Sequence, residues 1–146
     1  MSKKSPKIAA LIASFAGRGL PANYLGYFDC FNRGLFYEAH DVLEELWLAQ
    51  GKTAADYHFY KGLIQLAGAF VHLQKNRLKP SAALLNLAEA NLRKYGALHE
   101  RLDVSFVLAL IDSWRVKLES SQFLVNPLTH DNAPKIHLTA SDTKSG

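Results

Sequence analysis

The chain lacks the cysteines that mark several common classes of small protein. Cys30 is its single cysteine, so the sequence has neither an internal disulfide nor the paired cysteines of a structural zinc site. Its neighbours Phe28 and Phe31 predict an inert, buried thiol. A lone cysteine fits a reducing compartment, and we therefore expect a cytoplasmic protein.

Long hydrophobic runs are also missing, so no segment is expected to span a membrane. At the N-terminus, Lys3, Lys4 and Lys7 precede an apolar run over residues 8–13, which is the order of features in a secretory signal peptide. The run is short for such a peptide and alternates with small residues. A first helix that docks on the domain is therefore the favoured interpretation, and a cleaved segment over residues 1–16 is the alternative.

Charge of one sign is not concentrated anywhere in the sequence. The net charge is +4, but Lys and Arg alternate with acids, and the only basic clusters are those near Lys3 and at Arg93-Lys94. A nucleic-acid-binding protein needs a basic stripe, so no nucleic-acid partner is expected. With 146 residues, of which 49% are hydrophobic and 21% charged, the chain has the size and composition of one globular domain.

Hydrophobic periodicity predicts an all-α fold, a single-domain bundle of five to six helices built from helical hairpins around a long central helix. The predicted helices cover about residues 7–16, 22–32, 35–50, 55–76, 80–95 and 103–119. Asp103 is predicted to cap the last helix, which should bury Phe106, Val107, Leu110, Ile111 and Trp114. The helical domain, which contains the signature hairpin 22–50 and the central helix 55–76, should span residues 1–124, and a largely irregular tail should span 125–146.

The most informative stretch is residues 31–47, where a glycine turn at Gly34 leads into the helix predicted for residues 35–50. At about 100° per residue, one broad face of this helix is apolar and the opposite face carries Glu38, Asp41 and Glu45. His40 and Glu44 fall between these faces, one helical turn apart and near aromatic residues. An imidazole and a carboxylate are therefore placed side by side on a mainly apolar surface.

This stretch resembles a known family. The run Phe-Asn-x-Gly-x-Phe-x-Glu-Ala-His-x-x-x-Glu-x-x-Trp, over residues 31–47, is similar to the signature of the bacterial and archaeal domain-of-unknown-function family 309, whose hallmark H-x-x-x-E-x-x-W is His40, Glu44 and Trp47. A second similar block covers residues 59–72, and the resemblance extends over roughly residues 24–95. It implies a small all-helical domain with a metal or ligand site, and it implies no established reaction.

Metal or small-ligand binding is the sharper functional hypothesis. His40 and Glu44 offer nitrogen and oxygen ligands that suit a divalent ion such as zinc, manganese or iron. Further ligands must come from elsewhere, and His72, Gln65 and His58 on the central helix are the candidates. Tyr37 and Trp47 are expected to form the floor of the pocket, while Gly62 and Ala69 are expected to let the signature helix approach the central helix closely.

The alternative is structural. The Glu44 carboxylate can simply orient a half-buried His40, in a helical-hairpin scaffold that binds a protein partner or forms a homodimer. Such a module should expose a large apolar patch, whereas a ligand site should form a concave pocket. No nucleophile with an activating partner is evident, so the sequence assigns no reaction.

Overall fold

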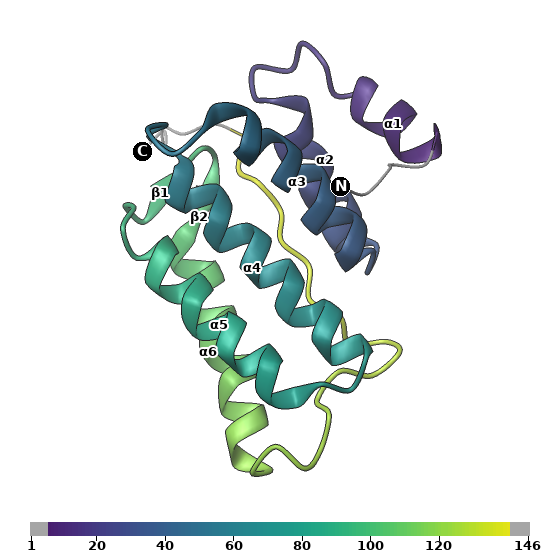
Figure 1. Cartoon of the computed structure of the whole chain (residues 1–146), viewed down its shortest axis with the longest axis vertical. Coiled ribbons are helices and arrows are strands. Elements are labelled where there is room, and N and C mark those ends of the chain that lie inside the picture. Colours follow the sequence, from purple (N-terminus) through teal and green to yellow (C-terminus); the bar gives the residue numbers. More distant parts are fainter. Residues whose placement is uncertain (1–5, 141–146) are drawn as a thin grey trace.

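The computed structural model describes residues 6–140, and within them it contains six α-helices and one short β-hairpin (Figure 1). The elements in chain order are α1 (Pro6–Ala13), α2 (Ala22–Asn32), α3 (Phe36–Gln50), α4 (Tyr57–Gln74), α5 (Leu78–Leu92), β1 (Leu98–His99), β2 (Leu102–Asp103) and α6 (Val104–Ser120). This confirms the predicted all-α helical bundle. The outermost parts of the predicted ranges, residues 1–5 and 141–146, lie outside the described residues.

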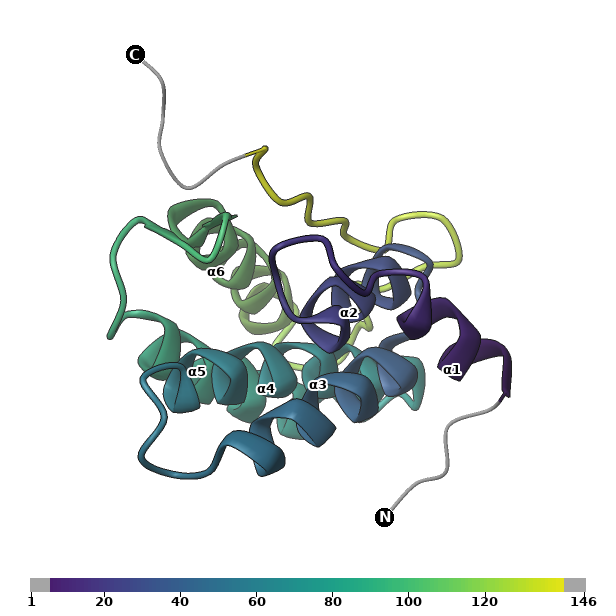
Figure 2. The ribbon, with the colours of Figure 1, turned by 90° about the horizontal axis from the view of Figure 1, so that it is seen from above.

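Helix α4 is the centre of the molecule, as the sequence predicted. Helices α3, α4 and α5 lie side by side in one layer, and α2, α6 and the segment after α6 lie across one side of that layer (Figure 2). Helix α1 packs against α2 at the edge. The other side of the layer, which faces the viewer in Figure 1, carries no further element in the described part of the chain.

Aromatic side chains fill the space between the two sides. The rings of Phe31, Phe36 and Phe70, from α2, α3 and α4, meet with centroid distances of 5.0 and 5.8 Å. Tyr27 is fully buried, and its hydroxyl donates a 2.6 Å hydrogen bond to the carbonyl of Leu63 on α4. Burial raises the pKa of Tyr27 well above its ordinary value, so this phenol stays protonated and can keep donating.

The local features that end and begin the helices agree with the sequence. Gly34 and Gly51 have φ angles of +74° and +80°, which glycine adopts without steric cost at the turn before α3 and at its C-terminal end. Asp103 caps α6, because its Oδ1 accepts a 3.0 Å hydrogen bond from the Phe106 N–H.

The single cysteine, Cys30, is a free thiol buried in α2. Burial raises the pKa of this thiol to about 11, which agrees with the predicted inert residue.

Two expectations were wrong. The β1–β2 hairpin was not predicted, and its two-residue turn places Glu100 and Arg101 at φ angles of +48° and +60°. The Phe106 side chain was expected to be buried but is 50% exposed, and Leu110 is only half-buried. Val107, Ile111 and Trp114 are buried as predicted. The buried residues at this end of α6 are Val104 and Val107, and Phe106 lies to one side of the face that they form.

The segment after α6 contains no helix or strand in residues 125–140, yet it is tied to the helices. Asn32 at the end of α2 holds it with two hydrogen bonds to Ile136, in which its side chain donates to the carbonyl at 2.8 Å and accepts from the N–H at 2.7 Å. Ile136 itself is buried in the core. Among residues 6–140, no helix combines the length and the apolar character needed to cross a membrane.

Candidate functional site

A pocket of about 230 Å³, which we call the α3–α4–α5 pocket, lies between three helices of the layer. Its lining comes from all three helices and consists of Tyr37, His40, Ile64, Gln65, Gly68, Val71, His72 and Leu84. Four of the predicted site residues, Tyr37, His40, Gln65 and His72, are therefore brought together on one cavity. Glu44 and Trp47 are not among the lining residues.

Gly68 makes room for this pocket. It faces the gap between α3 and α5, and a Cβ atom at this position would lie 3.1 Å from Leu84 Cδ1 and 4.0 Å from His40 Cδ2. The missing side chain thus lets the His40 ring lie over the backbone of α4. Gly62, which we expected to serve this purpose, instead faces α5, where its Cβ would meet Leu92, Ala88 and Asn91.

His40 has two carboxylate neighbours on its own helix. Its Nδ1 lies 3.2 Å from Oδ1 of Asp41, and its Nε2 lies 3.9 Å from Oε2 of Glu44. Ligand atoms of these three residues all lie within 4.8 Å of one another. Glu44, which the structural alternative made the partner of His40, is therefore too far away to hydrogen-bond, and the hydrogen-bond partner is Asp41.

Asp41 is the residue that sequence reasoning missed. We had placed it on the solvated face of the signature helix, but only 14% of its side chain is exposed. A carboxylate accepts hydrogen bonds and cannot donate, so a neutral His40 must carry its hydrogen on Nδ1. The unprotonated nitrogen is then Nε2, the ring atom nearer to Glu44.

His72 contributes a second imidazole from α4. Its Nδ1 is buried and has no hydrogen-bond partner among the described residues. Burial, followed by the nearby Arg77 and Lys75, lowers the pKa of His72, so the ring is neutral at pH 7. His72 lines the same pocket as His40 but does not join the close group formed by His40, Asp41 and Glu44.

The remaining predicted residues have other neighbours. Gln65 accepts a 2.8 Å hydrogen bond from Asn91 Nδ2 on α5, which fixes its position at the pocket wall. His58 lies outside the pocket, with its Nδ1 3.2 Å from Asn91 Oδ1. Trp47 packs against the Tyr57 ring at a centroid distance of 5.1 Å, and its buried Nε1 has no hydrogen-bond partner in residues 6–140.

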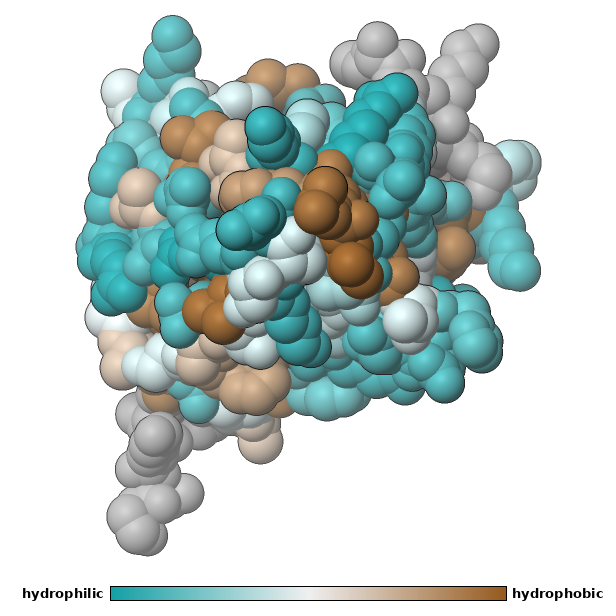
Figure 3. Space-filling view, turned by 90° about the horizontal axis from the view of Figure 1, so that it is seen from below, coloured by the Kyte–Doolittle hydropathy of each residue, from teal (hydrophilic) through white to brown (hydrophobic). Residues whose placement is uncertain are grey.

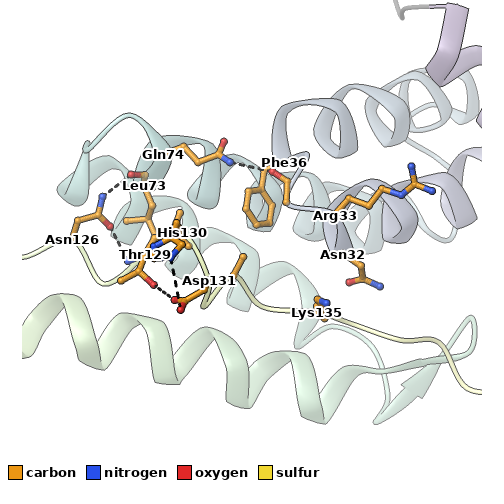
Figure 4. A pocket seen from close by; sticks show the side chains of 13 residues that line it. Asn32, Arg33, Phe36, Leu73, Gln74, Asn126, Thr129, His130, Asp131 and Lys135 are labelled. Carbon is orange, nitrogen blue, oxygen red and sulfur yellow. Dashed lines mark hydrogen bonds and ion pairs between the residues drawn. The ribbon is translucent and has the colours of Figure 1, made fainter.

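A larger cavity, of about 660 Å³, lies between the start of α3, the end of α4 and the segment after α6 (Figure 4). Its polar groups are largely bonded to the protein itself. Asn126 donates to the carbonyl of Leu73 at 2.6 Å, and Gln74 donates to the carbonyl of Gly34 at 3.1 Å. These bonds tie the segment to the helices, so the cavity is a weaker candidate than the α3–α4–α5 pocket.

A second group of close ligand atoms comes from Asp56, His99 and Glu100. His99 Nε2 lies 2.7 Å from Oδ1 of Asp56, and this pair joins the hairpin to the start of α4. The two residues are far apart in the sequence, and no motif links them, so only the fold reveals this pair.

A comparison with protein families gives a match to part of the chain. Residues 24–85 match a family model described as a domain of unknown function, DUF309. All residues that line the α3–α4–α5 pocket lie within this segment, whereas His99 and Glu100 lie outside it. No curated protein and no solved structure matches the chain.

Proposed function

Starting from the chain's membership of the DUF309 family over residues 24–85, as its signature predicted, we propose that His40 and Glu44 bind a divalent metal ion beside the α3–α4–α5 pocket. Zinc, manganese and iron are the candidate ions, because imidazole nitrogen and carboxylate oxygen suit all three. The pocket then holds a small ligand next to the ion. The family description assigns no activity, so the proposal depends on the site itself.

The arrangement around the His40 ring is the observation that carries this proposal. Metal-binding histidines commonly donate their second ring N–H to a carboxylate, which fixes the ring and its tautomer. Asp41, 3.2 Å from Nδ1, supplies that carboxylate and leaves Nε2 for the ion. Two ligand atoms with bonds of about 2.0–2.2 Å to a tetrahedral ion are about 3.3–3.6 Å apart. His40 Nε2 and Glu44 Oε2 are 3.9 Å apart, so a small rotation of the partly exposed Glu44 side chain brings the two atoms to the spacing of a shared ion.

Two protein ligands leave open coordination positions, which water or a ligand can fill. The pocket supports the second possibility, since it opens beside His40 and is lined by neutral groups, including Gln65 and His72. Tyr37 lies alongside His40, with the two rings 13° from parallel and their centroids 6.4 Å apart. The proposed site thus combines an ion on α3 with a mainly apolar chamber over α4.

The test is elemental analysis of untagged protein after dialysis, together with melting temperatures with and without added zinc, manganese or iron. Wild-type protein should hold one ion per chain and melt at a higher temperature when the ion is added. His40→Ala and Glu44→Gln should hold none. Glu45→Gln, an exposed neighbour on the same helix, is the matched control and should behave as wild type. Wild-type protein without metal, and with no thermal response to any of the ions, would refute the proposal.

The competing hypothesis is an interaction scaffold in which His40 and Asp41 form a purely structural pair. Some apolar side chains of α3 and α5 are exposed, since Tyr37, Leu48 and Leu87 are 50–58% exposed. At the end of the molecule seen from below, apolar side chains form separate small patches among hydrophilic ones (Figure 3). A scaffold needs a larger continuous patch. In the same experiment, a structural pair predicts loss of stability in His40→Ala with no bound metal in either protein.

A further inference from the structure

Another cavity, of about 350 Å³, lies between the loop before α2, α2 itself, the turn of the β1–β2 hairpin and the segment after α6. We call it the α2 pocket. Asn32 holds the segment against α2 through its two hydrogen bonds to Ile136. The Thr139 N–H donates a 2.8 Å hydrogen bond to the carbonyl of Arg101 in the hairpin turn. Parts of the chain that are far apart in sequence are therefore fixed around one opening.

The deeper walls of the α2 pocket are apolar. Phe28 and Ile136, which are 5% and 1% exposed, belong to the core and form its floor. Phe15, Leu25 and Leu138 are half-buried and form its sides. The open volume of about 350 Å³ corresponds to about twelve water molecules at ~30 Å³ each. It therefore has room for a six-membered ring and a polar head group.

Two guanidinium groups lie at this pocket. Arg18 is exposed, and its Cζ lies 5.2 Å from the centre of the Phe15 ring. It has no ion pair and no hydrogen bond within residues 6–140. Arg101 comes from the hairpin turn, and its Nη2 lies 3.5 Å from the position that a Cβ would take on Gly19, the residue after Arg18. The two cationic side chains therefore meet at the loop before α2.

The acidic residues near these two arginines have partners of their own. Asp29 lines the pocket, but its Oδ2 lies 3.1 Å from Nε of Arg33, which balances the charge of this carboxylate. Glu100 precedes Arg101 in the hairpin turn, and its carboxylate belongs to the close group with Asp56 and His99. The balance of charge at the α2 pocket is therefore positive.

We propose that the α2 pocket binds a small phosphate monoester with an apolar body, such as an aryl phosphate. The phosphate lies at Arg18 and Arg101, because planar guanidinium donors match its oxygens. Its charge of about −1.5 to −2 at pH 7 suits two cationic groups, whereas a carboxylate has only one charge. The body lies against Leu25 and Phe28. This inference is independent of the metal site proposed above.

The test is titration of nitrogen-15-labelled, metal-free protein with phenyl phosphate, followed through the amide chemical shifts. Benzoate keeps the ring with a single charge, inorganic phosphate lacks the body, and phenol lacks the charge. Phenyl phosphate should bind at least ten-fold more tightly than each of these three. The amides that shift should include those of Gly19 and Leu138, on two sides of the pocket. Removing metal beforehand ensures that the phosphate does not bind an ion at His40.

Variants link the binding to this pocket. Arg18→Gln and Arg101→Gln should each weaken the binding of phenyl phosphate at least five-fold. Arg18 is in an exposed loop, so its variant decides the question even if Arg101→Gln melts at a lower temperature. Arg93→Gln is the matched control, since the Arg93 side chain is 62% exposed on another surface and does not line the pocket. Leu25→Ala should weaken phenyl phosphate about three-fold and leave inorganic phosphate unchanged.

Three results would overturn the proposal. Equal affinities for phenyl phosphate and benzoate would exclude a phosphate-selective site, and equal affinities for phenyl phosphate and inorganic phosphate would exclude a bound apolar body. Unchanged binding in both arginine variants, or shifts confined to another surface, would exclude the α2 pocket as the site. None of these results affects the metal proposal, because elemental analysis measures that site separately.

Discussion

Replacing Gly68 by alanine should stabilise the protein, even though Gly68 lies in the pocket. Glycine inside a helix costs about 0.5–1 kcal/mol relative to alanine, because the unfolded chain loses more backbone freedom on folding. The new Cβ would lie 3.1 Å from Leu84 Cδ1, the end of a flexible and only half-buried side chain, and 4.0 Å from His40 Cδ2. A shift of a few tenths of an ångström in Leu84 relieves the contact, so we expect a net gain of about 0.5 kcal/mol.

Gly62 on the same helix provides the opposite case. A Cβ there would lie 3.0 Å from Leu92 Cγ, 3.2 Å from the Ala88 carbonyl oxygen and 3.2 Å from Asn91 Cβ. These atoms belong to the backbone of α5 or lie close to it, so they cannot move unless the helix moves. Overpacking of this kind costs about 1–3 kcal/mol, which exceeds the helix-propensity gain. Gly62→Ala should therefore destabilise the protein by about 1 kcal/mol.

Urea unfolding followed by circular dichroism measures both changes, with wild-type protein and the two variants treated identically. The free energies of unfolding of the variants should differ by about 1.5 kcal/mol, with Gly68→Ala above wild type and Gly62→Ala below it. If Gly68→Ala lost more than about 1 kcal/mol, Leu84 would be fixed in place and the pocket would be tighter than described. If Gly62→Ala were as stable as wild type, α4 and α5 would not be in close contact at this point.

Two further changes test the cap of α6 and the charge state of the pocket. Asp103→Ala should lower the free energy of unfolding by about 1 kcal/mol, because the Phe106 N–H loses its acceptor; an unchanged urea midpoint would show that this cap is not formed in solution. Burial lowers the pKa of His72 in the folded protein, so the unfolded chain takes up this proton first, and stability should fall as the pH drops below the ordinary histidine value of about 6.5. His72→Gln should flatten that part of the pH profile of unfolding, and an identical slope in both proteins would contradict the burial of this ring.

The sequence predicted the helices well where the apolar periodicity continues over many residues. The range predicted for α2, residues 22–32, agrees with the structure, and the wide apolar surface of α4 correctly identified it as the central helix. The hairpin between α5 and α6 could not be predicted in the same way. Its strands have two residues each, too few to show alternation, and its turn contains Glu100 and Arg101 where glycine or asparagine usually marks such a turn.

For the candidate site, the spacing of residues along a helix predicts the direction of each Cα–Cβ bond. It does not predict which rotamer the side chain adopts. His40 and Glu44 are one turn apart, so their side chains can meet, but the imidazole is hydrogen-bonded to the adjacent Asp41. Only the packed structure determines that choice, because Gly68 on α4 leaves the space into which the ring turns. The hydrogen-bond partner of His40 also determines whether the ring can bind an ion. A ring held by Glu44 through a direct hydrogen bond would have Nε2 occupied, whereas a ring held by Asp41 keeps Nε2 available for an ion shared with Glu44.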